Sequence, residues 1–180
     1  MYKRQLGNPT VRYCRAVLSD RHLAWLESRP VAAVIDGEIV CFHASPANDT
    51  EYLCWEVTPA GAVERTPEEI ARRLGAWPGM VVLCDHDHVT RILRLPGGEL
   101  LVDPGSVGCP AYGDDTPHPH VMETGSPAAR YAVLYRGRGG WEVQQVSVRY
   151  DYEASARLAE RNGRNDWAAW LRTGRAAPRA

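Results

Sequence analysis

The sequence MVVLCDHDH, residues 80–88, decides the fold that the chain is expected to adopt. Its first five residues are continuously apolar, which is typical of a short strand covered on both faces in a layered α/β protein. The last four residues place two carboxylates and two imidazoles directly after that strand. Because open α/β sheets carry their functional residues beyond the carboxyl ends of strands, residues 85–88 are predicted to belong to a site.

The segments around this strand predict further strands and helices. Asp36-Gly37 between two β-rich runs is a strong short signal for a hairpin. The sequence TPEE at 66–69 predicts a helix start, since it offers a capping threonine, a proline at the first helical position and a capping-box glutamate. The other expectations are a helix after Ser19 that ends before Pro30, hairpins at 91–95 with 99–102 and at 131–135 with 141–149, a long loop at 103–130, and closing helices at 151–162 and 166–171.

Bulk properties indicate an ordinary globular protein. At 180 residues with 44% hydrophobic and 24% charged residues, the chain is long enough for one domain, 1–180, with a core. The net charge of -1 leaves no electrostatic footprint for nucleic acid. No apolar run approaches the ~20 residues of a membrane span, and residues 1–5 do not begin a secretory signal, so a cytoplasmic protein is the default expectation. The oligomeric state stays open.

Cysteine spacing argues against cysteine-based sites. The five cysteines are scattered, and no two stand at a Cys-x-x-Cys spacing. A disulfide framework or a cysteine zinc site is therefore not expected. Small buried apolar residues are the simpler interpretation.

Histidines follow two of the expected strands. His43 comes after the second strand of the first hairpin, and His86 and His88 point to the same side of an extended segment. Imidazole suits zinc, iron, manganese and nickel, and Asp85 and Asp87 could orient the rings or supply oxygen ligands. A His-x-His pair alone is a weak signal for a metal, because such a pair is more often exposed or satisfied in the core. The metal interpretation depends on the other motifs.

Three short motifs occur in an order that resembles a known family. The C-terminal motifs of the calcineurin-like metallophosphoesterase superfamily are similar to HASP at 43–46, DHDH at 85–88 and LVDPGSVG at 101–108. The small bacterial and archaeal phosphodiesterase-like branch looks most similar, since its C-terminal strand and its Tyr-Asp before a helix resemble residues 131–134 and 150–152. The resemblance covers roughly residues 17–175.

The resemblance implies a fold and an activity. The fold would be the four-layer αββα sandwich, of which this chain supplies a C-terminal portion with mixed sheets and hairpins. The activity would be hydrolysis of a small-molecule phosphoester by a centre of two divalent metal ions (Mn, Fe, Zn or Ni). His43 and His86 would ligate one metal ion and His88 the other. Asp85, Asp87, Asp103 and Ser106 are the supporting candidates, and the loop at 103–108 is expected beside the histidines, with His118 and His120 outside the cluster.

The chain also departs from the family pattern. The upstream motifs Asp-x-His, Gly-Asp-x-x-Asp and Gly-Asn-His-Asp do not occur in the sequence, while Asp85 and Ala44 replace glycines, Asp87 a threonine and Asp103 an asparagine. We therefore expect an N-terminally incomplete metallophosphoesterase domain, with residues 1–16 not well ordered and little activity in this chain alone. The alternatives are a catalytically inactive relative that acts as a binding or interaction module, and a mononuclear three-histidine zinc hydrolase.

Overall fold

The computed structural model describes residues 8–77 and 79–177, which divide between two compact units, residues 1–31 and 32–180. In the first unit, α2 (Pro9–Val17) begins after Asn8, whose side chain accepts a hydrogen bond from the backbone of Thr10. α3 (Asp20–Glu27) follows and ends before Pro30, as expected. Order was not expected before residue 17, yet α2 is helical; residues 1–7 lie outside the described part. The single domain of residues 1–180 stays a prediction.

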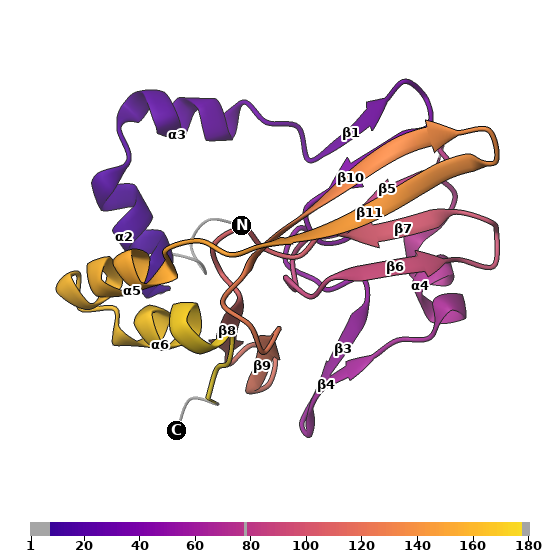
Figure 1. Cartoon of the computed structure of the whole chain (residues 1–180). Coiled ribbons are helices and arrows are strands. Elements are labelled where there is room, and N and C mark those ends of the chain that lie inside the picture. Colours follow the sequence, from indigo (N-terminus) through magenta and orange to yellow (C-terminus); the bar gives the residue numbers. More distant parts are fainter. Residues whose placement is uncertain (1–7, 78, 178–180) are drawn as a thin grey trace. The chain divides into compact units, whose positions relative to one another are not determined.

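A five-stranded mixed sheet forms the centre of the second unit (Figure 1). The parallel strands β2, β5 and β7 are adjacent, and β1 and β6 flank them in antiparallel orientation. The expected α/β class with a mixed sheet is therefore confirmed. The strand order is β1 (Ala32–Ile35), β2 (Ile39–Phe42), β5 (Val81–Leu83), β7 (Leu100–Asp103) and β6 (Arg91–Arg94).

The hairpin predicted at Asp36-Gly37 joins β1 to β2. Both turn residues have positive φ, 51° for Asp36 and 69° for Gly37, and the backbone N–H of Glu38 donates to the carbonyl of Ile35 at 3.1 Å. Glycine adopts such angles freely, and aspartate does so more readily than most residues. The dipeptide thus has the backbone preferences that a tight turn between twisted strands needs.

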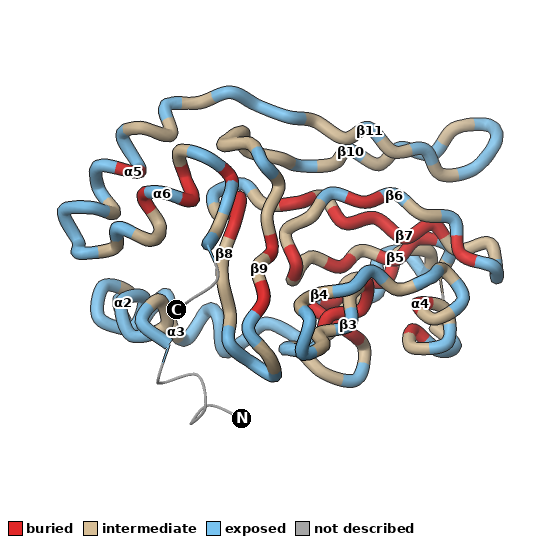
Figure 2. The backbone as a smooth tube through the Cα atoms, turned by 90° about the horizontal axis from the view of Figure 1, so that it is seen from below, coloured by how far each residue is buried: buried red, intermediate tan, exposed pale blue. Residues whose placement is uncertain are grey.

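Apolar side chains cover both faces of the sheet. On one face Val82 and Leu101 pack with Ile70 and Leu74 of α4 (Pro67–Leu74), whose predicted capping box between Thr66 and Glu69 is formed. Figure 2 shows buried residues concentrated on β5 and β7. Each such leucine or valine contributes roughly 1.5–3 kcal/mol by leaving water. The other face packs against the inward side chains of a long hairpin, Ala132, Leu134, Trp141 and Val143.

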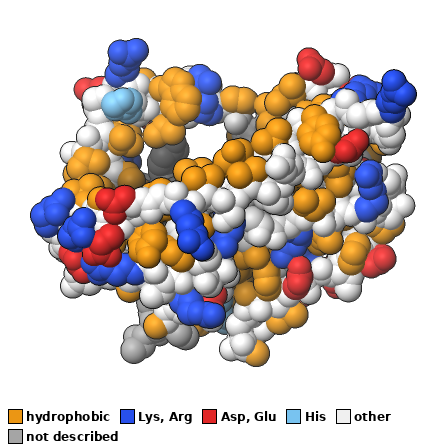
Figure 3. Space-filling view, viewed as in Figure 1, with side chains coloured by type: hydrophobic (Ala, Val, Ile, Leu, Met, Phe, Trp, Pro, Cys, Tyr) orange, Lys and Arg blue, Asp and Glu red, His pale blue; other side chains and the backbone are white. Residues whose placement is uncertain are grey.

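That hairpin consists of β10 (Ala129–Gly137) and β11 (Gly140–Val148), close to the predicted strands. Its outward side chains Tyr131, Val133 and Tyr135 are exposed, and hydrophobic side chains gather over this region in Figure 3. α4, the mixed sheet and the hairpin therefore form three successive layers of an α/β sandwich.

The remaining elements include two hairpins that the sequence did not predict. They are β3 (Trp55–Thr58) with β4 (Gly61–Glu64), and β8 (Ala111–Asp114) with β9 (His120–Glu123), which lies inside the expected long loop. The two closing helices are confirmed as α5 (Tyr152–Arg161) and α6 (Asn165–Thr173). Among the described residues, no helix is both long and apolar enough to cross a membrane.

Candidate metal site at the carboxyl ends of three parallel strands

Three parallel strands bring the predicted site residues to one edge of the sheet. His43 directly follows β2, residues 85–88 follow β5, and Asp103 is the last residue of β7. Since the strands are parallel neighbours, their carboxyl ends lie at the same edge. A hydrogen bond of 3.0 Å from the backbone N–H of Asp85 to the carbonyl of His43 ties the first two segments together.

The imidazoles of the predicted cluster are neighbours. The ring centroids of His43 and His86 lie 4.7 Å apart with an interplanar angle of 67°. The His88 ring packs edge-on against Tyr112, with centroids 5.1 Å apart. His88 is also close enough for its charge to lower the pKa of both other histidines. His43 is exposed, whereas His86 and His88 are half-buried, so the cluster opens to solvent on the His43 side.

Backbone carbonyls hold two of these rings. Nδ1 of His88 lies 2.8 Å from the carbonyl oxygen of Cys109, and a ring nitrogen of His86 bonds the backbone of Thr50. A carbonyl only accepts, so the nitrogen that faces it carries the hydrogen and the other nitrogen keeps a free lone pair. Carbonyl partners of this kind orient histidines that ligate metals.

Burial keeps the imidazoles neutral. Loss of hydration lowers the pKa of His86 to about 4 and also lowers the pKa of His43 and of His88. At neutral pH the three rings therefore carry no proton that a metal ion would have to displace.

Two buried carboxylate oxygens at this edge of the sheet have no hydrogen-bond partner among the described residues. They are Oδ1 of Asp49, whose charge acts on His43, and Oδ1 of Asp85, whose charge acts on Asp103. Burial raises the pKa of Asp85 to about 7. Buried oxygens normally have a partner, so the partnerless Asp49 oxygen near the neutral His43 ring fits a divalent cation by donor chemistry. In residues 8–77 and 79–177, however, no three His, Cys, Asp or Glu side chains are arranged to hold a metal ion as they stand.

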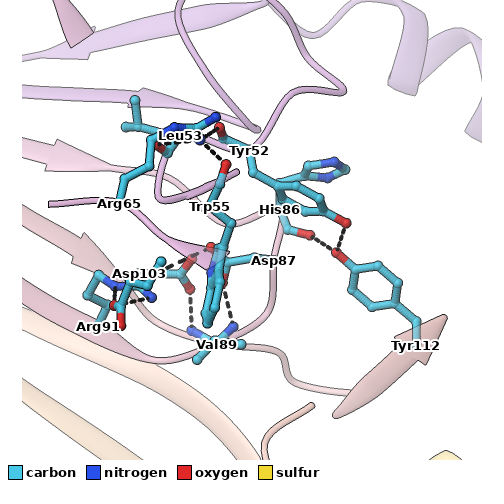
Figure 4. Close-up of polar contacts among 12 residues, drawn as sticks. Tyr52, Leu53, Trp55, Arg65, His86, Asp87, Val89, Arg91, Asp103 and Tyr112 are labelled. Atoms are coloured by element: carbon cyan, nitrogen blue, oxygen red, sulfur yellow. Dashed lines mark hydrogen bonds and ion pairs between the residues drawn. The ribbon is translucent and has the colours of Figure 1, made fainter. Parts of the chain in front are cut away.

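Asp87 faces away from the histidines and into the protein. Its Oδ1 accepts from the backbone N–H of Val89 at 2.8 Å, and its Oδ2 lies 3.5 Å from the Arg91 guanidinium (Figure 4). This follows from the alternation of side chains in an extended segment, which puts residue 87 on the side opposite to 86 and 88. The structure thus brings His43, His86 and His88 together, and places Asp85 near Asp87 and Asp103, where Asp87 forms a buried ion pair with Arg91.

His88 has a left-handed backbone. Its φ of 64° is uncommon for a residue with a side chain, although histidine tolerates it better than most. Such angles cost on the order of 1 kcal/mol or more and concentrate at functional sites. The twist aims the His88 ring at Tyr112 and Cys109 rather than along the strand direction.

The loop after β7 packs beside His88, as expected. Oγ of Ser106 accepts from the backbone N–H of Cys109 at 2.9 Å, and the Cys109 carbonyl bonds His88. Asp103 shapes the start of this loop, because its Oδ1 accepts from the Gly105 N–H at 2.8 Å. Ser106 therefore reaches the histidine cluster through Cys109 and does not lie far from it.

Asp103 is a neutral acid in this environment. It is fully buried, and burial, followed by the charge of Asp87, raises its pKa to about 9. Its Oδ1 accepts a hydrogen bond from the Gly105 N–H. An asparagine, the residue of the similar family motif, would accept the same bond and has no proton that titrates.

We therefore expect Asp103→Asn to remove a pH dependence of stability. The pKa of Asp103 is higher in the folded chain than its ordinary 3.8, so folding retains a proton and stability falls as the pH rises from about 4 to about 9. The difference in unfolding free energy between the Asn variant and wild type should increase by about 2–3 kcal/mol, in favour of the variant, from pH 5 to pH 8. One pH unit corresponds to about 1.4 kcal/mol, and coupling of Asp103 to Asp87 reduces the total.

Urea unfolding in metal-free buffer at both pH values measures this difference. The exposed Glu56→Gln is the matched control, because it removes a carboxylate outside the buried cluster. A parallel pH profile for wild type and Asp103→Asn would show that Asp103 is ionised in the folded protein.

Sequence reasoning missed several residues that surround the site. Tyr52 stacks on His86 with ring centroids 4.7 Å apart, and Tyr112 donates to the His86 carbonyl at 2.9 Å. His120 was expected outside the cluster; it contacts Tyr52 rather than the three histidines and is buried. His118 is half-buried and meets His120 through its backbone carbonyl. None of these residues stands in a motif, so only the fold brings them to the site.

We compared the chain with known protein families, curated proteins and solved structures. No family model matches the chain, and no curated protein matches it. Among solved structures, a metallophosphoesterase from Sphaerobacter thermophilus is similar, with a TM-score of 0.66 and 21% sequence identity over 93% of this chain and 69% of that chain. The fold is that of a metallophosphoesterase.

The metallophosphoesterase fold accounts for the placement of the layers. Its mixed sheet, with α4 on one face and the β10–β11 hairpin on the other, agrees with the αββα portion expected from the three short motifs. The identity of 21% supports the architecture alone. What the histidines of this chain bind, and what the chain acts on, has to be argued from its own residues.

Proposed function

We propose that the protein is a metal-dependent phosphoester hydrolase whose metal centre includes His43, His86 and His88. The observation that supports this most directly is the meeting of neutral imidazoles, with the partnerless Asp49 oxygen near His43, at the carboxyl edge of the parallel strands. The finer assignment, to the small bacterial and archaeal phosphodiesterase-like branch with a dinuclear centre, rests on the motifs at 43–46, 85–88 and 101–108.

The residues of this chain would bind and orient. His88 and His86 present lone pairs because backbone carbonyls hold their other ring nitrogens. Asp49 supplies negative charge close to His43. Divalent ions, when bound, lower the pKa of water and offset the charge of phosphate oxygens. A phosphoester is thus the substrate class that such a centre suits.

A binding protein of the same fold is the second candidate. The absence, within the described residues, of three ligands already arranged for a metal ion favours it. Three imidazoles and two carboxylates are also fewer groups than two catalytic metal ions need. A mononuclear three-histidine zinc hydrolase would need fewer ligands.

Metal content and hydrolysis distinguish these candidates. We expect the purified chain to bind Mn²⁺ or Zn²⁺ and to hydrolyse bis(4-nitrophenyl) phosphate in a metal-dependent manner, with low turnover. His88→Asn should abolish both, since asparagine keeps the left-handed backbone but removes the imidazole. His118→Ala, a histidine outside the cluster, should change neither. Absence of turnover, with or without bound metal, would favour the binding protein. Turnover with one zinc ion per chain would favour the mononuclear hydrolase, and no metal binding would exclude both hydrolases.

A further inference from the structure

Two tyrosines and a histidine form a hydrogen-bonded network behind His86. The Tyr52 hydroxyl lies 2.7 Å from the Tyr112 hydroxyl and 3.0 Å from Nε2 of His120. The Tyr112 hydroxyl donates to the carbonyl of His86 at 2.9 Å, and Nδ1 of His120 lies 2.8 Å from the carbonyl of His118. Figure 4 shows the Tyr112 hydroxyl between the Tyr52 hydroxyl and the His86 carbonyl. The network thus ends on the backbone of a proposed metal ligand.

Counting hydrogens gives the network a direction. Burial raises the pKa of both phenols, so each keeps one hydrogen. The Tyr112 hydroxyl donates its hydrogen to the His86 carbonyl, which can only accept. Tyr52 must therefore donate to Tyr112. The contact between the Tyr52 hydroxyl and Nε2 of His120 lies at the far end of the network. The donors run from Tyr52 through Tyr112 to His86.

Tyr52 also fixes the ring of His86. The two rings are stacked, with centroids 4.7 Å apart and planes inclined by 29°. The His120 ring also contacts Tyr52 edge-on, with ring centroids 5.5 Å apart. His86 is therefore held at its ring by Tyr52, at its carbonyl by Tyr112 and at a ring nitrogen by the backbone of Thr50.

The segment that carries Tyr52 is itself anchored. Arg65 donates to the carbonyl oxygens of Tyr52 at 2.9 Å and of Leu53 at 3.4 Å, and to that of Trp55. Tyr52 and Leu53 are both buried, so the segment has little freedom to shift. Rigid support of this kind lets one side chain determine the orientation of another.

We propose that Tyr52 is a positioning residue for the metal centre, because it stacks on His86 and links His120 to the Tyr112 clamp on the His86 backbone. The inference rests on the proposed function, since it assigns a role at that centre. A buried tyrosine needs one partner for its hydroxyl. Tyr52 has two partners for its hydroxyl and also stacks on the ring of a proposed ligand, which is more than burial requires. Mutation of residues that contact metal ligands typically changes metal affinity by 10–100-fold.

The test compares three single hydroxyl deletions. Tyr52→Phe keeps the stacked ring and removes the centre of the network, Tyr112→Phe removes the donor to His86, and Tyr131→Phe makes the same chemical change on the exposed face of β10. Each variant is titrated with Co²⁺ by visible absorbance, with thermal unfolding measured on the metal-free protein. We expect Tyr52→Phe and Tyr112→Phe to bind Co²⁺ about tenfold more weakly and to shift the absorbance band at saturation, and Tyr131→Phe to match wild type.

The outcomes separate the two proposals. If wild type binds no Co²⁺, the proposed function fails. If wild type binds Co²⁺ and the two network variants match Tyr131→Phe in affinity and spectrum, the positioning role is overturned while the proposed function stands. A band shift is decisive because a purely structural role would lower the melting temperature without changing the ligand geometry. Should Tyr52→Phe fail to fold, Tyr112→Phe decides by the same criteria.

Discussion

His86→Ala should weaken Co²⁺ binding by roughly a hundredfold or more. His86 stands at the centre of the cluster, since its ring contacts both His43 and Tyr52. The change removes a neutral imidazole whose loss no other histidine of the cluster replaces. Because changes in partners outside the ligand shell already cost 10–100-fold in affinity, loss of a ligand itself should cost at least as much. Isothermal titration calorimetry with Co²⁺ at pH 7.5 measures the effect.

His118→Ala provides the control for this substitution. It also removes an imidazole, but the described contact of His118 with its surroundings is through the backbone carbonyl, which the substitution keeps. Equal Co²⁺ affinity in His86→Ala and His118→Ala would place the metal elsewhere. The metal-free His86→Ala protein should lose only about 1–3 kcal/mol of stability, as expected for the loss of two aromatic contact pairs. Weaker binding would therefore not reflect unfolding.

The edge of the sheet could be predicted because local signals agree with the pairing of strands. Asp36-Gly37 specifies a turn by its backbone angles, and the apolar run at 80–84 indicates a strand buried on both faces. Once two parallel strands are adjacent, the positions of His43 and His86 follow from where each strand ends. Such features depend on a few consecutive residues.

The surroundings of the site could not be predicted, since they depend on contacts between distant segments. Tyr52 and His120 are separated by 68 positions, and Tyr52 and Tyr112 by 60. The segment at 103–130 is rich in proline and glycine and was interpreted as a loop, yet the hairpin β8–β9 within it carries Tyr112 and His120. Turn-forming composition gives no hint that short strands between turns pair.

Arg91→Met should lower the unfolding free energy by about 3–5 kcal/mol, because it removes one partner of a buried ion pair. The side chains of Arg91 and Asp87 are only 6% and 5% exposed, and Nη1 of Arg91 lies 3.5 Å from Oδ2 of Asp87. Without the guanidinium, Asp87 faces only the neutral Asp103 and the Val89 N–H. Burial already raises the pKa of Asp87, and loss of Arg91 raises it further, so the destabilisation should grow as the pH rises. Urea unfolding at pH 5 and pH 8 measures both effects.

Two further variants separate the buried pair from the exposed one. Arg91 also donates to Oε1 of Glu64 at 2.8 Å, but the Glu64 side chain is 57% exposed. Glu64→Gln should therefore cost no more than about 1 kcal/mol, as exposed ion pairs contribute little. The double variant Asp87→Asn with Arg91→Met should recover part of the loss, because no unpaired charge is left in the core. Arg91→Met and Glu64→Gln could instead lose equal amounts of unfolding free energy, with no recovery in the double variant. That result would mean that Asp87 does not need its positive partner. Packing and backbone hydrogen bonds would then hold the segment that carries His86 and His88.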